Sequence, residues 1–192
     1  KEHLRYALKI RDWGFVPEYE AWEMSKGSSG WQVGKSDRIE WQKIIEAAEK
    51  VGRAKPAELI QNLKSENDSI RYWGAIGLGA HMNQLTTPSI SALKIALEDS
   101  SPSVRIEAAN ALVRVGKSEP ALSRLIEELD HKNLIVVTHA ARTIELLGDL
   151  AKKAGPAMEA CLKRAYAVRT PDLSPVVVLP GDQDMAMFAV SY

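Results

Sequence analysis

The sequence has a single cysteine, no surplus of charge and no long hydrophobic run, and each absence excludes a class of protein. Cys161 alone can form neither an internal disulfide nor a metal site built from several cysteines. Lys plus Arg and Asp plus Glu both total 25, so the surplus of basic charge that nucleic-acid binding needs is missing. No apolar run approaches the roughly 20 residues that span a bilayer. We therefore expect neither a nucleic-acid nor a membrane partner.

The 192 residues, 45% of them apolar, fit one globular domain or two small ones. The chain opens on Lys1, with no initiator Met and none of the charged and apolar regions of a signal peptide. We expect it to be a piece of a longer protein.

A repeat of 32 to 34 residues is the main feature of the chain. Segments beginning at Ser69, Ser103 and Ile135 align, at offsets of 34 and 32 residues. Each segment holds a β-branched residue, two small residues four and five positions later, and an aliphatic residue at eight. These residues are Ile70, Gly74, Ala75 and Leu78; Val104, Ala108, Ala109 and Leu112; and Val136, Ala140, Ala141 and Ile144. Positions with that spacing share one face of an α-helix, and small side chains let a second helix approach closely.

A second set of helices precedes these three. Pro56, Pro88 and Pro120 recur every 32 residues, and proline suits the first turn of a helix. Leucine pairs four residues apart follow each proline: Leu59 and Leu63, Leu93 and Leu97, and Leu125 and Leu129. Polar turns then supply N-caps for the three aligned helices, and glycines are expected to end them. Those glycines are Gly79, Gly116 and Gly148, and Pro156 opens a fourth copy.

Alternating helices that each carry one apolar stripe predict an all-α fold, a right-handed solenoid of antiparallel helix pairs (an α-α superhelix). A single pair cannot bury its stripe alone, so neighbouring pairs stack. We expect residues 1–50 to form a helical lead-in with a linker, and residues 51–192 to hold three pairs and part of a fourth. Within the lead-in, an apolar stripe through Trp41 and Ile44 predicts a helix that ends at Gly52.

The aligned helices open on a recurring pattern. Asp68-Ser69-Ile70-Arg71 begins the first of them, and Arg105 recurs at the position of Arg71 one copy later. Together with the small-residue face and the aliphatic ladder, this pattern resembles HEAT repeats, a family of helical-hairpin solenoids, over residues 51–165. The third copy departs from the family pattern because Val137 stands in the place of the arginine. An arginine ladder is therefore not expected to continue there.

A second resemblance begins near the amino-terminal end. A helix-like stretch and Arg11-Asp12-Trp13-Gly14-Phe15-Val16-Pro17-Glu18 are followed by a polar loop, by Ile44-Ile45-Glu46-Ala47-Ala48-Glu49 and by Arg71-Tyr72-Trp73-Gly74-Ala75. This order of features over residues 3–115 is similar to that of a subset of bacterial sulfatases. In those enzymes the end of the catalytic region is followed by a loop, an Ile-Ile-Glu-Ala-Ala-like helix and HEAT-type repeats.

The second resemblance implies that the chain is the carboxy-terminal portion of an exported sulfatase, periplasmic or secreted. Such enzymes hydrolyse sulfate esters or N-sulfates of sugars with a formylglycine nucleophile and a calcium ion. Their nucleophile motif is Cys or Ser, any residue, Pro, any residue, Arg. Cys161 lacks the proline, and Arg105 comes one position late after Ser100-Ser101-Pro102. We therefore expect no catalytic, cofactor-binding or metal-binding residue in this segment, whose partners would be the catalytic domain of the same chain and a sulfated glycan.

Four residues are candidates for contact with a ligand or a sugar. Trp31 lies in a glycine-rich loop, and it and Trp22 could stack on a sugar ring or cover the first helix pair. Arg71 and Arg105, at equal positions in two copies, could project together towards an acidic ligand. They could instead bond to a neighbouring aspartate and to turn carbonyls, and so tie one repeat to the next.

Three further features favour structural roles. The four histidines have no metal-ligand spacing; they are His3, His81, His131 and His139. The glycines between 74 and 79 fall within a helix rather than ahead of one, unlike those of a nucleotide-binding loop. Cys161 lies on the apolar stripe of its helix, which predicts a buried thiol.

The predicted function is that of a non-catalytic HEAT-repeat extension of a sulfatase, which supports the catalytic region or forms one wall of its cleft. A free-standing adaptor that binds a protein or peptide on its concave face is the first alternative. A HEAT-class lyase acting on a bulky cofactor is the second, and would need acids and histidines clustered along one groove. A helical-repeat glycosylase acting on nucleic acid ranks last because no basic stripe is present.

Overall fold

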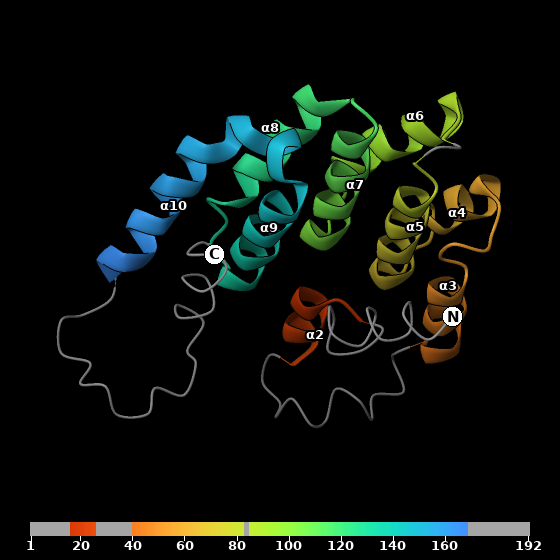
Figure 1. The fold of residues 1–192 in the computed structure, drawn as a ribbon. Coiled ribbons are helices and arrows are strands. Elements are labelled where there is room, and N and C mark those ends of the chain that lie inside the picture. The colour runs from red at the N-terminus through yellow and green to blue at the C-terminus, as the bar shows by residue number, and fades with distance from the viewer. Residues whose placement is uncertain (1–15, 26–39, 83–84, 169–192) are drawn as a thin grey trace.

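The computed structural model describes residues 16–25, 40–82 and 85–168, and every regular element in these ranges is a helix (Figure 1). The elements are α2 (Glu18–Ser25), α3 (Trp41–Glu49), α4 (Pro56–Asn62), α5 (Asp68–Ala80), α6 (Thr87–Ala96), α7 (Pro102–Arg114), α8 (Ser118–Glu128), α9 (Leu134–Leu147), the 3-10 helix η3 (Gly148–Ala154) and α10 (Gly155–Val168). The prediction of an all-α fold is confirmed.

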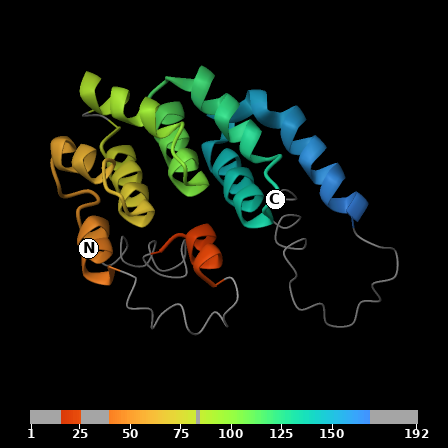
Figure 2. The same cartoon turned by 180° about the vertical axis from the view of Figure 1, so that it is seen from behind.

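The repeat helices form two layers (Figures 1 and 2). The second helices of the pairs, α5, α7 and α9, stand side by side, with α7 packed between the other two. The first helices α4, α6 and α8 each pack against the second helix of their own pair, and α10 continues the outer row. This is the predicted solenoid of antiparallel pairs. The helix η3, which joins α9 to α10, was not predicted.

The small-residue face brings the two layers into close contact. A Cβ placed on Gly74 would lie 3.0 Å from the backbone N of Leu63 and 3.1 Å from the carbonyl O of Leu59. The equivalent residues Ala108 and Ala140 are fully buried in α7 and α9. The aligned small residues therefore mark the contact faces of the second helices, as the spacing predicts.

The polar turns cap the second helices as predicted. Side-chain oxygens of Asn67, Ser101 and Asn133 each accept a hydrogen bond from a backbone N–H in the first turn of α5, α7 and α9, at 2.8 to 3.2 Å. Each cap satisfies one of the N–H groups that have no partner within the helix.

Glycine ends two of the second helices but not the first. Gly116 and Gly148 have φ angles of 76° and 54°, in the left-handed region that favours glycine. Helix α5 instead continues through Gly79 to Ala80, so the predicted end at Gly79 is wrong. A Cβ on Gly79 would lie 3.3 Å from the Cβ of Ala111, so this glycine serves the contact between α5 and α7.

The lead-in packs on the repeats through two helices. Helix α3 lies against α5 and buries Ile44, Ala47 and Ala48, and Gly52 follows it with a φ of 72°. Helix α2 contacts α7 and α9 and lies across their ends in Figure 1. The lead-in helix predicted from the stripe at Ile44 is therefore present, while the domain boundary at residue 50 remains a prediction.

Candidate functional site

Three polar turns share one edge of the solenoid. They are residues 65–68, 99–101 and 130–133, which precede α5, α7 and α9. We call this edge the turn edge. The N-terminal ends of three helices meet there, and each carries a partial positive charge from its unpaired N–H groups.

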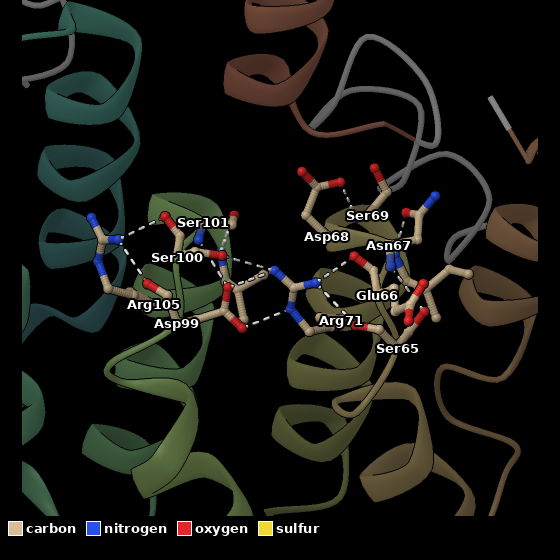
Figure 3. A network of polar contacts seen from close by, with 12 residues as sticks. Ser65, Glu66, Asn67, Asp68, Ser69, Arg71, Asp99, Ser100, Ser101 and Arg105 are labelled. Atoms are coloured by element: carbon tan, nitrogen blue, oxygen red, sulfur yellow. Dashed lines mark hydrogen bonds and ion pairs between the residues drawn. The ribbon is translucent and has the colours of Figure 1, made fainter. Parts of the chain in front are cut away.

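Arg71 joins the first two turns (Figure 3). Its Nε and Nη2 donate to the two carboxylate oxygens of Asp99 at 2.7 and 2.8 Å. Its Nη1 donates to the carbonyl oxygens of Ser65 and Glu66 at 3.0 and 2.9 Å. The hydrogen bonds to Asp99 raise the pKa of the Arg71 guanidinium. Because the side chains of Arg71 and Asp99 are only 13% and 11% exposed, this bidentate pair is largely shielded from water.

Arg105 repeats the arrangement one pair later. Its Nε and Nη2 donate to Glu128 at 2.6 and 3.0 Å, and its Nη1 donates to the carbonyl oxygens of Asp99 and Ser100 at 2.8 and 3.2 Å. Glu128 belongs to the end of α8 and its side chain is 4% exposed. Each arginine thus binds the carbonyls of its own turn and an acid of the next repeat.

The series of arginine–acid pairs, the arginine ladder, changes at the third turn. Val137 offers no donor, and Arg164 of α10 reaches back instead, donating to the carbonyl O of Leu129 at 3.2 Å and pairing with Asp130. The side chains of Arg164 and Asp130 are 52% and 69% exposed, so this tie is weaker than the two before it.

Helix α2 places a buried carboxylate on the turn edge. The Ser101 hydroxyl donates to Oε1 of Glu20 at 2.5 Å, and the Ser103 hydroxyl donates to Oε2 at 2.7 Å. We call these two hydroxyls the serine seat. Glu20 is 4% exposed. Burial raises the pKa of Glu20, the two serine hydrogen bonds oppose that rise, and the charge of Asp68 adds to it.

Tyr19, the residue of α2 that precedes Glu20, contacts the third turn. Its ring meets the His131 ring edge-on, with centroids 6.0 Å apart and an interplanar angle of 89°. Its hydroxyl donates to Oε1 of Glu23 at 2.9 Å. Burial raises the pKa of Tyr19 to about 12, so the phenol stays protonated. Helix α2 therefore bridges the second and third turns.

The candidate ligand-contact residues meet this edge in part. Arg71 and Arg105 lie on it, engaged with acids of the next repeat, and α2 brings the backbone of Trp22 to it. The side chain of Trp22 and all of Trp31 lie outside the described residues. Contact of these four residues with a ligand remains a prediction.

The contact of the Glu20 carboxylate with Ser101 and Ser103 was not predicted from the sequence. The partners are separated by 81 and 83 residues. No short-range pattern marks such a contact. The one available signal was an acid in the first turn of a short helix, which alone predicts only a favourable interaction with that helix's own N-terminus.

A second polar cluster joins α7 to α9. Nε2 of His139 lies 3.0 Å from Oε1 of Glu107, and Asn110 donates to Oε2 of Glu107 at 3.1 Å. Glu107 is 2% exposed, and the Tyr72 ring lies 6.4 Å from the His139 ring, centroid to centroid. One acid and one histidine at equal repeat positions thus tie neighbouring helices together. Within the described residues, no three potential metal ligands gather in one place.

Cys161 is buried, as its place on the apolar stripe predicts. Burial raises the pKa of its thiol, which disfavours the thiolate that a nucleophile needs. In the described part of the chain, every helix is too short or too polar to cross a bilayer.

Comparisons with known proteins agree with this architecture. A family model described as HEAT repeats matches residues 56–145 and 90–170, which together exceed half of the chain. No curated protein matches.

One solved structure is similar. It is the complex of CpcE and CpcF of phycocyanin lyase from Nostoc sp. PCC7120, 29% identical, with a TM-score of 0.47, covering 72% of this chain and 54% of that one. The chain thus spans about half the length of the solved chain it matches. None of these comparisons links it to a sulfatase. From the family match and the stacked helix pairs, the chain belongs to the HEAT-repeat family.

Proposed function

We propose that this chain is a non-catalytic scaffold, in which the HEAT repeats hold the segment that comes before them. The observation that carries the proposal is the buried carboxylate of Glu20, bonded to Ser101 and Ser103 at 2.5 and 2.7 Å. A carboxylate withdrawn from water is unfavourable unless donors replace its hydration. Two hydroxyls from the repeats supply such donors, so the repeats provide the place where α2 is fixed.

The wider proposal is that the full-length protein is an exported sulfatase, periplasmic or secreted, with these repeats at its carboxy-terminal end. Its support is the resemblance of Arg11–Glu18 to the end of a sulfatase catalytic region, followed by the loop, the α3 sequence and the repeats. Glu18 is also the first residue of α2. A catalytic region that ended there would therefore lead directly into the helix that rests on the turn edge.

In that arrangement the chemistry belongs to the preceding region. A formylglycine and a calcium ion there would hydrolyse sulfate esters or N-sulfates of sugars, and the repeats would stabilise that region or form a wall beside a sulfated glycan. In this segment, the one thiol is buried with a raised pKa. Arg71 and Arg105, whose side chains are largely shielded from water in the described part of the chain, are paired with Asp99 and Glu128. These residues favour a structural role for the segment, in which it supports the preceding region.

Two measurements test the proposal. The purified chain, with calcium present, is expected to release no sulfate from an aryl sulfate or from N-sulfated glucosamine, and the full-length reading frame is expected to encode the nucleophile motif upstream. Hydrolysis by this chain that disappears in Cys161→Ala would contradict the non-catalytic role. An upstream sequence without the motif would contradict the sulfatase assignment and favour the free-standing adaptor.

A further inference from the structure

Each second helix turns one stripe of residues towards the second helix of the next pair. The stripe has spacings of three, four and three residues, which keep its members on one face of a helix. It holds Ser69, Tyr72, Ile76 and Gly79 in α5, and Ser103, Ile106, Asn110 and Val113 in α7. A Cβ placed on Gly79 would lie 3.3 Å from the Cβ of Ala111, so the stripe of α5 meets α7 directly.

Helix α9 carries the same stripe, which we call the α9 stripe, as Ile135, Thr138, Arg142 and Glu145. None of these four residues is fully buried, and the Arg142 side chain is 65% exposed. Oγ1 of Thr138 and Oε2 of Glu145 are shielded from water but have no hydrogen-bond partner in the described part of the chain. The ion pair between Arg142 and Glu145 spans 3.9 Å, which is too long for a hydrogen bond. Because shielded polar atoms are ordinarily paired, the α9 stripe is an incomplete packing face.

The fourth pair has a first helix but no second helix among the described residues. Helix α10 continues the outer row, while α9 is the last described helix of the inner row (Figures 1 and 2). Residues 169–192 follow α10 in the sequence and lie outside the described residues. In the earlier pairs, the helix that packs beside the stripe comes after the first helix of the next pair. The residues after α10 are therefore placed in the chain order that the α9 stripe requires.

Residues 182–192 repeat the pattern that opens the second helices. Asp182, a preferred N-cap residue, stands three residues before Met185. The observed caps stand three residues before the first apolar position in the same way: Asn67 before Ile70, Ser101 before Val104, and Asn133 before Val136. Ala189 takes the place of Gly74, Ala108 and Ala140, and Phe188 takes the place of Trp73. Met185 is unbranched and Val190 is larger than the alanines at its position, so the match lies in the cap, the apolar positions and the small residue.

We propose that residues 182–192 dock on the α9 stripe as the second helix of the fourth pair. The proposal goes beyond the scaffold role, because it assigns a segment to the opposite end of the repeats from the lead-in. It rests on the repeat geometry alone and does not depend on the sulfatase assignment.

The contacts between the described second helices fix the register of this docking. Glu107 and His139, at equal positions of α7 and α9, lie 3.0 Å apart. Gly79 of α5 meets Ala111, which stands two positions earlier in its own copy. Carried one helix further, the two steps place Phe188 beside His139 and Tyr192 beside Glu145.

This register gives each side of the docked segment a different role. The Tyr192 hydroxyl can donate to Oε2 of Glu145, which supplies the missing hydrogen bond. Phe188 and Tyr192, four residues apart on one helical face, both turn towards α9. Met187 stands at the position of Thr138, on the stripe that turns away from the preceding helix.

Thiol labelling of the full chain carrying Thr138→Cys tests the docking. Mass spectrometry locates the label, so Cys161 stays in place and its burial reports any global unfolding. Phe188→Ala is expected to speed alkylation at position 138 by about fivefold or more, because the covering segment then opens more often. Met187→Ala shortens a side chain of the same segment on the face turned away, so it is expected to leave the rate unchanged. Labelling of Cys161 is expected to stay slow in all these chains.

Hydrogen exchange gives a second measurement in the wild-type chain, in case the cysteine variant does not keep its helices by circular dichroism. The amides of residues 185–192 are expected to exchange more slowly in the chain than in a free peptide of that sequence. Equal labelling rates in the Phe188 and Met187 variants, or exchange at the rate of the free peptide, would overturn the proposal. Protection that is lost on dilution would also overturn it, because a second copy of the chain would then cover the stripe. None of these outcomes bears on sulfatase chemistry.

Discussion

Arg71 and Arg124 both form ion pairs, but their surroundings give the pairs different weight. Arg71 makes four hydrogen bonds to Asp99 and two turn carbonyls in a site shielded from water. Removing it leaves Asp99 without its cation, so we expect Arg71→Ala to lower the free energy of unfolding by about 2–4 kcal/mol, allowing for the remaining exposure. Urea unfolding followed by circular dichroism measures the loss.

Arg124 supplies the matched control on the outer layer. It pairs with Glu98 and Glu127, whose side chains are 74% and 61% exposed. We expect Arg124→Ala to change the free energy of unfolding by no more than about 1 kcal/mol. Equal losses in the Arg71 and Arg124 variants would show that the arginine ladder adds nothing to the cohesion of the repeats.

Glu20 links stability to pH. Its pKa is raised in the folded chain above the ordinary value of 4.5, so the folded state binds more protons between those two values. Stability is therefore greatest below the ordinary pKa and falls as the pH rises through the folded one. Glu20→Gln removes the charge but keeps groups that can bond to the serines, so we expect the wild type to lose stability relative to this variant towards pH 8.

The difference between the two chains is expected to be smallest below the ordinary pKa of a glutamate and to grow as the pH rises. Urea unfolding of both chains at a series of pH values measures the difference. A difference that is independent of pH, or one that grows on acidification, would show that Glu20 is not a buried carboxylate in the folded chain.

At the scale of the helix, Gly74 marks a close contact between α5 and the end of α4. The atoms that a Cβ would meet there belong to the backbone or lie next to it, so they cannot move aside as a side-chain tip could. We expect Gly74→Ala to destabilise the fold by about 1–3 kcal/mol, despite the better helix propensity of alanine. Thermal unfolding measures the change.

Gly155, in the first turn of α10, is the control. No atom lies within 4 Å of a Cβ placed there, and its φ of −48° suits any residue. We expect Gly155→Ala to be neutral or to stabilise by up to about 1 kcal/mol. If Gly74→Ala behaved in the same way, the close contact of the two layers at this position would be wrong.

The helices could be predicted from the sequence where interactions between residues close in the chain determine them. Periodic stripes, polar turns and capping residues such as Asn67 and Ser101 act within a few residues, so the pairs and the starts of the second helices followed from spacing. Gly79 was misassigned because tight packing against Ala111 and helix termination both favour glycine. The partner of Arg105 and the docking of Glu20 depend on tertiary approach, which no short-range pattern encodes.

At the scale of the whole molecule, the row of second helices is continuous, but the arginine ladder along the turn edge is interrupted. Helices α5, α7 and α9 form an unbroken row, whereas the ladder of arginines ends where Val137 replaces the third one. Helix α2 bridges the turns on either side of that change through Glu20 and Tyr19. The contact between α2 and the serine seat therefore fixes this part of the lead-in on the turn edge.

Hydrogen exchange at the α2 amides of the full chain tests that contact most directly. In the wild type we expect these amides to exchange more slowly than in an unfolded peptide. Ser103→Ala should speed their exchange about tenfold or more, because a hydrogen bond to a charged group contributes about 1.5–3 kcal/mol. Ser123→Ala, on the exposed face of α8, should leave them unchanged. Exchange in α2 at the unfolded rate in the wild type, or equal effects of the two serine variants, would show that the serine seat does not hold α2.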